Sequence, residues 1–176
     1  MHDQATALRE RLRPPRPVAE VWAVATFGGE RGALQFSREI MAMLTGARCA
    51  VRLWGANTDD AEVVLLPSGE GVARVRRPYL RGAHTWLLLC PAREEGLAEC
   101  RRLLGELRDR SLRRVYLALS GVATVQEGER VVERFRDNLA ADIPYQPEPF
   151  GFYGPNEGGA ITLSQQVLRR FFSAGR

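Results

Sequence analysis

Three glycines within six residues form the stretch of this sequence with the clearest capacity for chemistry. Residues 27–32 read Phe-Gly-Gly-Glu-Arg-Gly and directly follow an apolar run at residues 21–25. Glycine lets a backbone turn sharply and come close to a ligand. From Ala33 onward apolar residues recur at helical spacing, so the turn would lead into a helix whose free N–H groups and dipole attract an anion. We therefore expect a nucleotide- or anion-binding site made of Gly28, Gly29, Glu30, Arg31 and Gly32.

The remaining reactive side chains do not form a recognisable catalytic or metal-binding pattern. His2 lies near the N-terminus, and His84 precedes an apolar run without an acid or nucleophile at a known spacing. The three cysteines, an odd number without a C-x-x-C pair, indicate reduced core thiols of a cytoplasmic protein. We expect no catalytic residues and no metal.

Length and composition are those of one globular domain. The chain has 176 residues, with 45% hydrophobic and 26% charged residues, and no apolar run long enough to cross a membrane. Every one of its 25 basic residues is arginine, and the net charge of +4 permits nucleic-acid binding without requiring it. Residues 1–17, rich in arginine and proline, are expected to form a basic tail, and residues 18–176 a single α/β domain.

Apolar runs alternate with amphipathic segments along the chain. Strands are expected at residues 21–26, 49–54, 62–66, 85–90 and 114–119, with a last helix at residues 162–173. Thr124 and Glu127 form a capping-box signal for the helix before it. This alternation predicts a three-layer α/β sandwich with a mainly parallel sheet. Residues 62–76 have two possible interpretations, a parallel strand or a hairpin that turns at residues 67–71.

This order of elements resembles the MinD/ParA family of P-loop ATPases, which includes the flagellar-number regulators and the TadZ/CpaE pilus-localisation proteins. The family loop reads K-G-G-x-G-K-[ST]. Residues 27–30 align with its first four positions, with Phe27 where the signature lysine belongs, and residues 31–33 stand where G-K-[ST] belongs. The resemblance covers residues 18–172 and implies a P-loop NTPase-like fold that is truncated between the second and third strands. It also implies a short strand at residues 141–145, which match the Ile-Pro-Tyr strand of the family.

The residues that carry the family's chemistry differ in this sequence. A P-loop needs a lysine charge on the β- and γ-phosphates and a hydroxyl on magnesium, and this chain contains no lysine. Pro67 stands where a strand of the family ends in a metal-binding aspartate, and Ser120 where an asparagine contacts the nucleotide base. We therefore expect no ATP hydrolysis and no cofactor, with at most weak binding of ATP or ADP.

Aromatic residues near the C-terminus form a second expected site. Phe150, Phe152 and Tyr153 lie in a stretch rich in glycine and proline at residues 146–159, where the family holds its base. They either pack against the sheet or contact a partner, and we take partner binding, together with Phe171 and Phe172, as the site prediction. The partner would be a protein, a second copy of this chain included. The last helix of the MinD branch lies on membranes, and membrane contact here is the weaker alternative.

The resemblance implies a role in the spatial organisation of a bacterial cell, performed in the cytoplasm by binding rather than by hydrolysis. One alternative is nonspecific DNA binding by surface arginines, namely Arg74, Arg76, Arg77 and Arg81. A second alternative is a nucleotide-binding protein or weak ATPase with a reshaped anion site.

Overall fold

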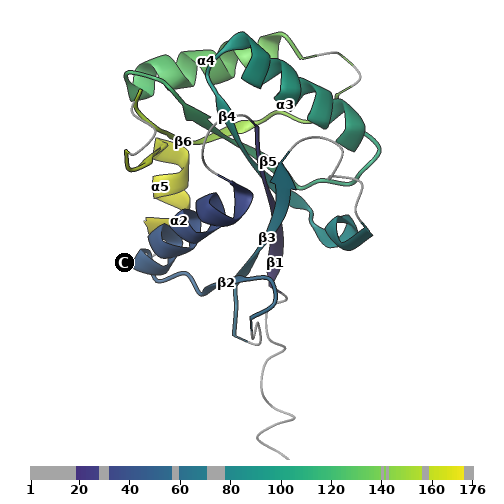
Figure 1. Cartoon of the computed structure of the whole chain (residues 1–176), viewed down its shortest axis with the longest axis vertical. Coiled ribbons are helices and arrows are strands. Elements are labelled where there is room, and N and C mark those ends of the chain that lie inside the picture. Colours follow the sequence, from purple (N-terminus) through teal and green to yellow (C-terminus); the bar gives the residue numbers. More distant parts are fainter. Residues whose placement is uncertain are drawn as a thin grey trace, which may run out of the picture.

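A seven-stranded sheet forms the centre of the molecule in a computed structural model (Figure 1). The model describes residues 19–27, 32–56, 60–70, 78–139, 141, 143–155 and 159–172. The strand order is β2-β3-β1-β4-β5-β6-β7, and every neighbouring pair is parallel except β6 and β7. The strands are β1 (Glu20–Thr26), β2 (Val51–Leu53), β3 (Val63–Glu70), β4 (Thr85–Pro91), β5 (Arg114–Ser120), β6 (Glu148–Phe152) and β7 (Thr162–Leu163).

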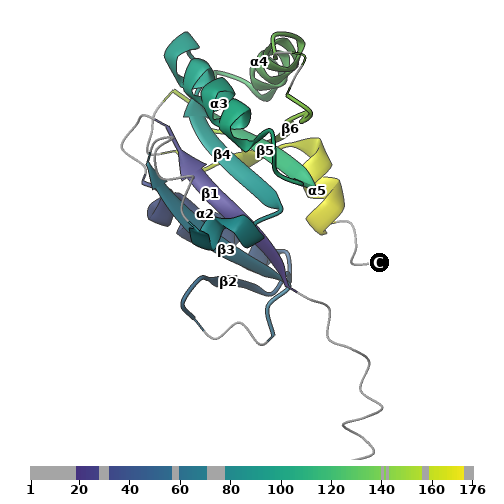
Figure 2. The same cartoon turned by 90° about the vertical axis from the view of Figure 1, so that its right-hand side faces the viewer.

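Helices cover both faces of this sheet, as Figures 1 and 2 show. Helices α2 (Ala33–Gly46) and α5 (Gln165–Phe172) bury their apolar residues on one face. Helices α3 (Glu94–Leu107) and α4 (Val125–Asp137) cover the other face, and the short 3-10 helix η2 (Pro78–Gly82) adds Leu80 to the same core. The expected three-layer α/β sandwich with a mainly parallel sheet is therefore confirmed.

Strand β1, in the interior of the sheet, shows why the strands are continuous apolar runs in the sequence. Trp22 and Val24 pack into the core beneath α2 and α5, whereas Ala23 and Ala25 pack into the core beneath α3 and α4. Successive side chains of a strand point to opposite faces, and a parallel sheet covered on both faces needs apolar residues on both.

The structure decides between the two readings of residues 62–76. Strand β3 lies between β1 and β2 and pairs in parallel with both, so the hairpin reading is wrong for residues 63–70, while residues 71–76 lie outside the described part of the chain. The strand also does not end at Pro67. Its register with β1 shifts just beyond Pro67, and the hydroxyl of Ser68 donates to the Val24 carbonyl at 2.9 Å. A bulge of this kind accommodates a proline, which has no N–H for the ladder.

The C-terminal third differs from the expectation in two places. Residues 143–145 form no strand, and β6 begins instead at Glu148. Residues 162–163 form β7 beside Gly151 and Phe152 rather than the first turn of the last helix, which begins at Gln165. Gly151 permits this pairing, since a Cβ there would stand 2.8 Å from Ile161 and 2.9 Å from the Thr162 carbonyl oxygen.

The expected cap of α4 is confirmed. The backbone N–H of Glu127 donates to the Thr124 hydroxyl at 3.1 Å, and the Glu127 carboxylate accepts from the Ala123 N–H at 2.7 Å. Two backbone donors at the start of the helix are thereby satisfied.

Candidate functional site

The carboxyl ends of β1, β3 and β4 meet at one edge of the sheet. Thr26, the last residue of β1, pairs with Glu70 on β3 and with Leu89 on β4. The chain leaves β1 for α2 on one face and leaves β4 for α3 on the opposite face. Ligands of open α/β sheets bind where neighbouring connections diverge in this way. Of the predicted anion site, Gly32 lies at this edge, whereas Gly28, Gly29, Glu30 and Arg31 lie outside the described residues.

Helix α2 begins at this edge without any side-chain cap. Gly32 is its extended N-cap residue, and the Gly32 carbonyl accepts from the Phe36 N–H at 3.0 Å. The first turn carries no acidic side chain, and the nearby hydroxyl of Ser37 donates to the Ala33 carbonyl at 2.7 Å instead. The N–H groups of a first helical turn have no partner within the helix. This end of α2 therefore has the backbone chemistry of an anion site, with no side chain of its own to occupy it.

Thr26 is the functional candidate that sequence reasoning missed. Its side chain is buried, and its hydroxyl has no hydrogen-bond partner among the described residues. A buried hydroxyl without a partner costs about 1–3 kcal/mol. The available signal was a polar residue that ends an apolar strand directly before a glycine turn. Among the described residues of this edge, Thr26 fits contact with a bound ligand best.

Phe27, which the sequence resemblance aligns with the signature lysine, is a core residue. Its side chain is 4% exposed and lies in the apolar cluster beneath α3 and α4. Its N–H donates to the Leu89 carbonyl at 2.9 Å, which fixes the backbone at this point. A lysine here would place a charge among apolar side chains, where ionised groups are strongly disfavoured unless they are paired. The position is therefore built for packing and not for binding phosphate.

The aromatic residues of β6 do not form an exposed patch. Phe150 and Tyr153 are 0% exposed and Phe152 is 3% exposed. Phe150 packs against Trp22 at 6.3 Å between ring centroids, and the Tyr153 hydroxyl donates to Glu39 at 2.8 Å. Their burial favours the alternative that these three residues pack against the sheet, because they lie in or beside a strand covered on both faces, and partner binding through them stays a prediction.

The two aromatic residues at the end of α5, Phe171 and Phe172, differ in how far their side chains are exposed. Phe171 is partly buried, with its ring 5.8 Å from that of Trp22, and the guanidinium of Arg170 lies 5.2 Å from the Phe171 ring. Phe172 is 45% exposed. Of the five aromatic residues expected to contact a partner, Phe172 has the most accessible side chain.

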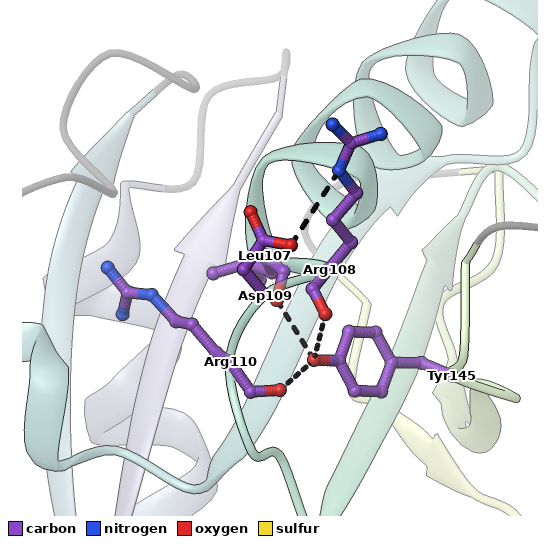
Figure 3. A network of polar contacts seen from close by, with 5 residues as sticks. All are labelled: Leu107, Arg108, Asp109, Arg110 and Tyr145. Atoms are coloured by element: carbon purple, nitrogen blue, oxygen red, sulfur yellow. Dashed lines mark hydrogen bonds and ion pairs between the residues drawn. The ribbon is translucent and has the colours of Figure 1, made fainter.

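Tyr145, from the segment expected to be a strand, is a structural residue at the end of α3 (Figure 3). Its hydroxyl lies 2.9 Å from the carbonyl oxygen of Leu107, 3.3 Å from that of Arg108, and also contacts that of Arg110. A phenol has one hydrogen to donate, so the three carbonyls share it. Burial, above all, raises the pKa of Tyr145, which keeps the donor protonated. The hydroxyl thereby satisfies carbonyls that the helix end leaves free.

The remaining expectations concern DNA, metals and membranes. Arg81 is exposed on η2, whereas Arg74, Arg76 and Arg77 lie outside the described residues. Within the described ranges, no three His, Cys, Asp or Glu residues come together as ligands for a metal ion. No helix in those ranges has the length and apolarity needed to cross a membrane.

The strand order and the helices on both faces define a doubly wound α/β fold. Comparison with solved structures agrees. The MinD cell division protein of Aquifex aeolicus superposes with a TM-score of 0.57 over 90% of this chain and 87% of that chain, at 13% identity. The MinC:MinD cell division protein complex of the same organism gives 0.57 over 79% of this chain and 82% of that chain, at 12% identity. No family model and no curated protein sequence matches the chain. The chain thus has the MinD-type fold that the sequence led us to expect.

Proposed function

We propose that this chain is a MinD/ParA-like domain that does not hydrolyse ATP and acts by binding a protein partner in the spatial organisation of a bacterial cell. The similar structures are cell division proteins, and one of them is a complex of MinD with MinC. The shared fold supports a role of the same kind for this chain.

The environment of Phe27 carries the proposal. Phosphoryl transfer depends on positioned charges that stabilise the transferred group, so each missing charge removes orders of magnitude in rate. Phe27 is buried in the core where the family has its signature lysine, and Gly32 and Ala33 offer neither a charge nor a hydroxyl. Pro67 lies inside β3, at the position compared with the metal-binding aspartate. The four residues compared with catalytic positions of the family thus serve backbone geometry or packing.

The proposal is tested by measuring phosphate release from ATP in the presence of magnesium. We expect a rate equal to that of buffer, both for the natural chain and for a Gly28→Val variant. Magnesium-dependent turnover that disappears in Gly28→Val would contradict the proposal, because it would locate hydrolysis in the glycine turn. A contaminating ATPase would give turnover that the variant does not change.

A second measurement addresses nucleotide control of assembly. In the family, ATP held between two subunits drives dimerisation through the signature lysine. We expect the molar mass of this chain, measured by light scattering during gel filtration, to be the same with and without ATP and magnesium. An ATP-dependent dimer would show that the turn still works as a nucleotide switch.

A further inference from the structure

A groove of about 430 Å³ runs between α3 and α4 on the outer surface of the molecule. Leu97 and Arg101 of α3 line one side, and Val131, Arg134 and Phe135 of α4 line the other. Residues three or four apart lie on the same side of a helix, so each helix presents both apolar and basic residues to the groove. The volume is that of a site for a few side chains and is too small for a whole helix.

The floor of the groove is apolar. Val131 and Phe135 are 8% and 3% exposed, and Leu97 is partly buried against the same cluster. These side chains belong to the core that joins α3 and α4 to the sheet. The floor is therefore fixed by packing, and a ligand would meet both polar and apolar atoms in the groove.

Two arginines border this floor without any acidic partner. The guanidinium carbon of Arg101 lies 5.8 Å from the ring centroid of Phe135, and its Nε is buried with no hydrogen-bond acceptor among the described residues. Within the same part of the chain, neither Arg101 nor Arg134 makes an ion pair. The neighbouring Arg102, in contrast, pairs with Glu99 at 2.8 Å. Because buried N–H donors almost always have acceptors, the Nε of Arg101 points to a missing one.

The net charge of the groove indicates that the missing acceptor is an anion. Two arginines and one glutamate, Glu94, line it, which gives a net charge of +1. Arginine forms paired, charge-assisted hydrogen bonds with carboxylates. A nucleic-acid backbone would require several cations to neutralise successive phosphates, and the apolar floor offers it no contact.

We propose that the groove between α3 and α4 docks an acidic segment of a partner protein. A carboxylate of that segment lies beside Arg101 and Arg134, and an adjacent apolar side chain rests on Leu97, Val131 and Phe135. This inference deepens the proposed function and rests on it, since it assigns the surface through which the domain binds its partner.

The test uses two short fluorescein-labelled peptides, one that alternates glutamate with leucine and one with glutamine in place of glutamate. Fluorescence anisotropy gives the affinities, and ¹⁵N chemical shifts of the natural chain locate the contact. We expect the glutamate peptide to bind, with shifts confined to α3 and α4, and the glutamine peptide to bind at least about tenfold more weakly, which corresponds to about 1.4 kcal/mol.

Three single variants assign the effect to the groove. Arg134→Gln changes an exposed side chain and should fold normally, and it should weaken the glutamate peptide about tenfold, as should Arg101→Gln if that variant folds. Arg102→Gln is the matched control, one residue away on α3 and paired with Glu99, and should leave the affinity unchanged.

Several outcomes would overturn the inference: no binding of the glutamate peptide, equal binding of both peptides, shifts outside α3 and α4, or full affinity in Arg134→Gln. Each of these outcomes, combined with no ATP turnover, would refute the docking of an acidic segment in the groove. The proposed function would then still hold, but the partner would bind to another surface. Peptide binding together with magnesium-dependent turnover lost in Gly28→Val would uphold the groove and refute the proposed function.

Discussion

Replacing Gly128 by alanine tests the packing of α4 on the sheet. Gly128 faces Phe152, and a Cβ at position 128 would stand 2.2 Å from Cδ1 and 2.4 Å from Cε1 of that ring. Such distances are far below van der Waals contact, so the ring or the helix must move. Both Phe152 and Gly128 are buried, which leaves the ring little space to move into.

The magnitude follows from two opposing terms. Overpacking of a buried site costs about 1–3 kcal/mol. Alanine in place of glycine within a helix stabilises it by about 0.5–1 kcal/mol. We therefore expect a net loss of about 1–2 kcal/mol in the free energy of unfolding. For a domain of this size, each kcal/mol shifts Tm by about 2–4 °C, so Gly128→Ala should lower Tm by about 2–8 °C.

Gly105→Ala provides a matched control. Gly105 lies in α3, and a Cβ there would meet no atom within 4 Å. The Gly105→Ala variant should therefore gain the stabilisation that alanine gives a helix over glycine, without a steric clash, and its Tm should rise by about 1–4 °C. Both variants are compared by urea and thermal unfolding followed by circular dichroism at 222 nm. The double variant Gly128→Ala/Phe152→Leu should lose less stability than the two single variants added together, because the smaller side chain removes the clash.

One result would refute this reasoning. If Gly128→Ala stabilised the chain as much as Gly105→Ala does, Phe152 would not lie against α4. The burial of Phe152 would then no longer argue against its predicted role in partner binding, whereas Phe150 and Tyr153 would remain packed on the opposite face of the sheet.

Two further predictions concern single side chains. Phe27→Lys should lower the free energy of unfolding by more than 3 kcal/mol, since it removes a buried aromatic ring and introduces an unpaired charge, whereas Phe27→Leu should cost markedly less in the same urea titration. Tyr145→Phe should cost about 1–3 kcal/mol, because carbonyls at the end of α3 lose their donor. Because the pKa of Tyr145 is raised in the fold, the stability linked to its protonation is present below about pH 10 and is lost as pH rises through the folded-state value. The natural chain should therefore lose more stability than Tyr145→Phe between neutral pH and about pH 11, and equal losses would assign the effect to other groups.

Local signals predicted the helices well. The apolar spacing that begins at Ala33 and the capping box at Thr124 and Glu127 are set by contacts between residues three or four apart, and the structure shows both. Strand β6 was missed because Pro147, Pro149 and Gly151 are breakers in any local reading. Pairing with β5 and β7 stabilises it, with a register shift beside Pro149, and no local pattern contains that pairing.

The candidate site was predicted only in outline for a similar reason. The start of α2 is a local feature, and its place at the carboxyl edge follows from the α/β pattern. The continuation of β3 through Pro67 depends on the register with β1, and the unsatisfied hydroxyl of Thr26 depends on which side chains surround it. Both facts come from residues distant in sequence.

Thr26 and Phe27 are consecutive, yet their side chains have opposite chemistry within this edge. Phe27 is part of the core beneath α3 and α4, whereas Thr26 keeps a polar group that no described residue satisfies. Among the described residues of this edge, the backbone N–H groups at the start of α2 and the Thr26 hydroxyl are the groups that a ligand could meet, and the chain contains no lysine to add the charge of an active P-loop. A lysine at position 27 would be stable only if the apolar cluster around it also changed. Introducing a charge at position 27 would thus disturb the packing beneath α3 and α4.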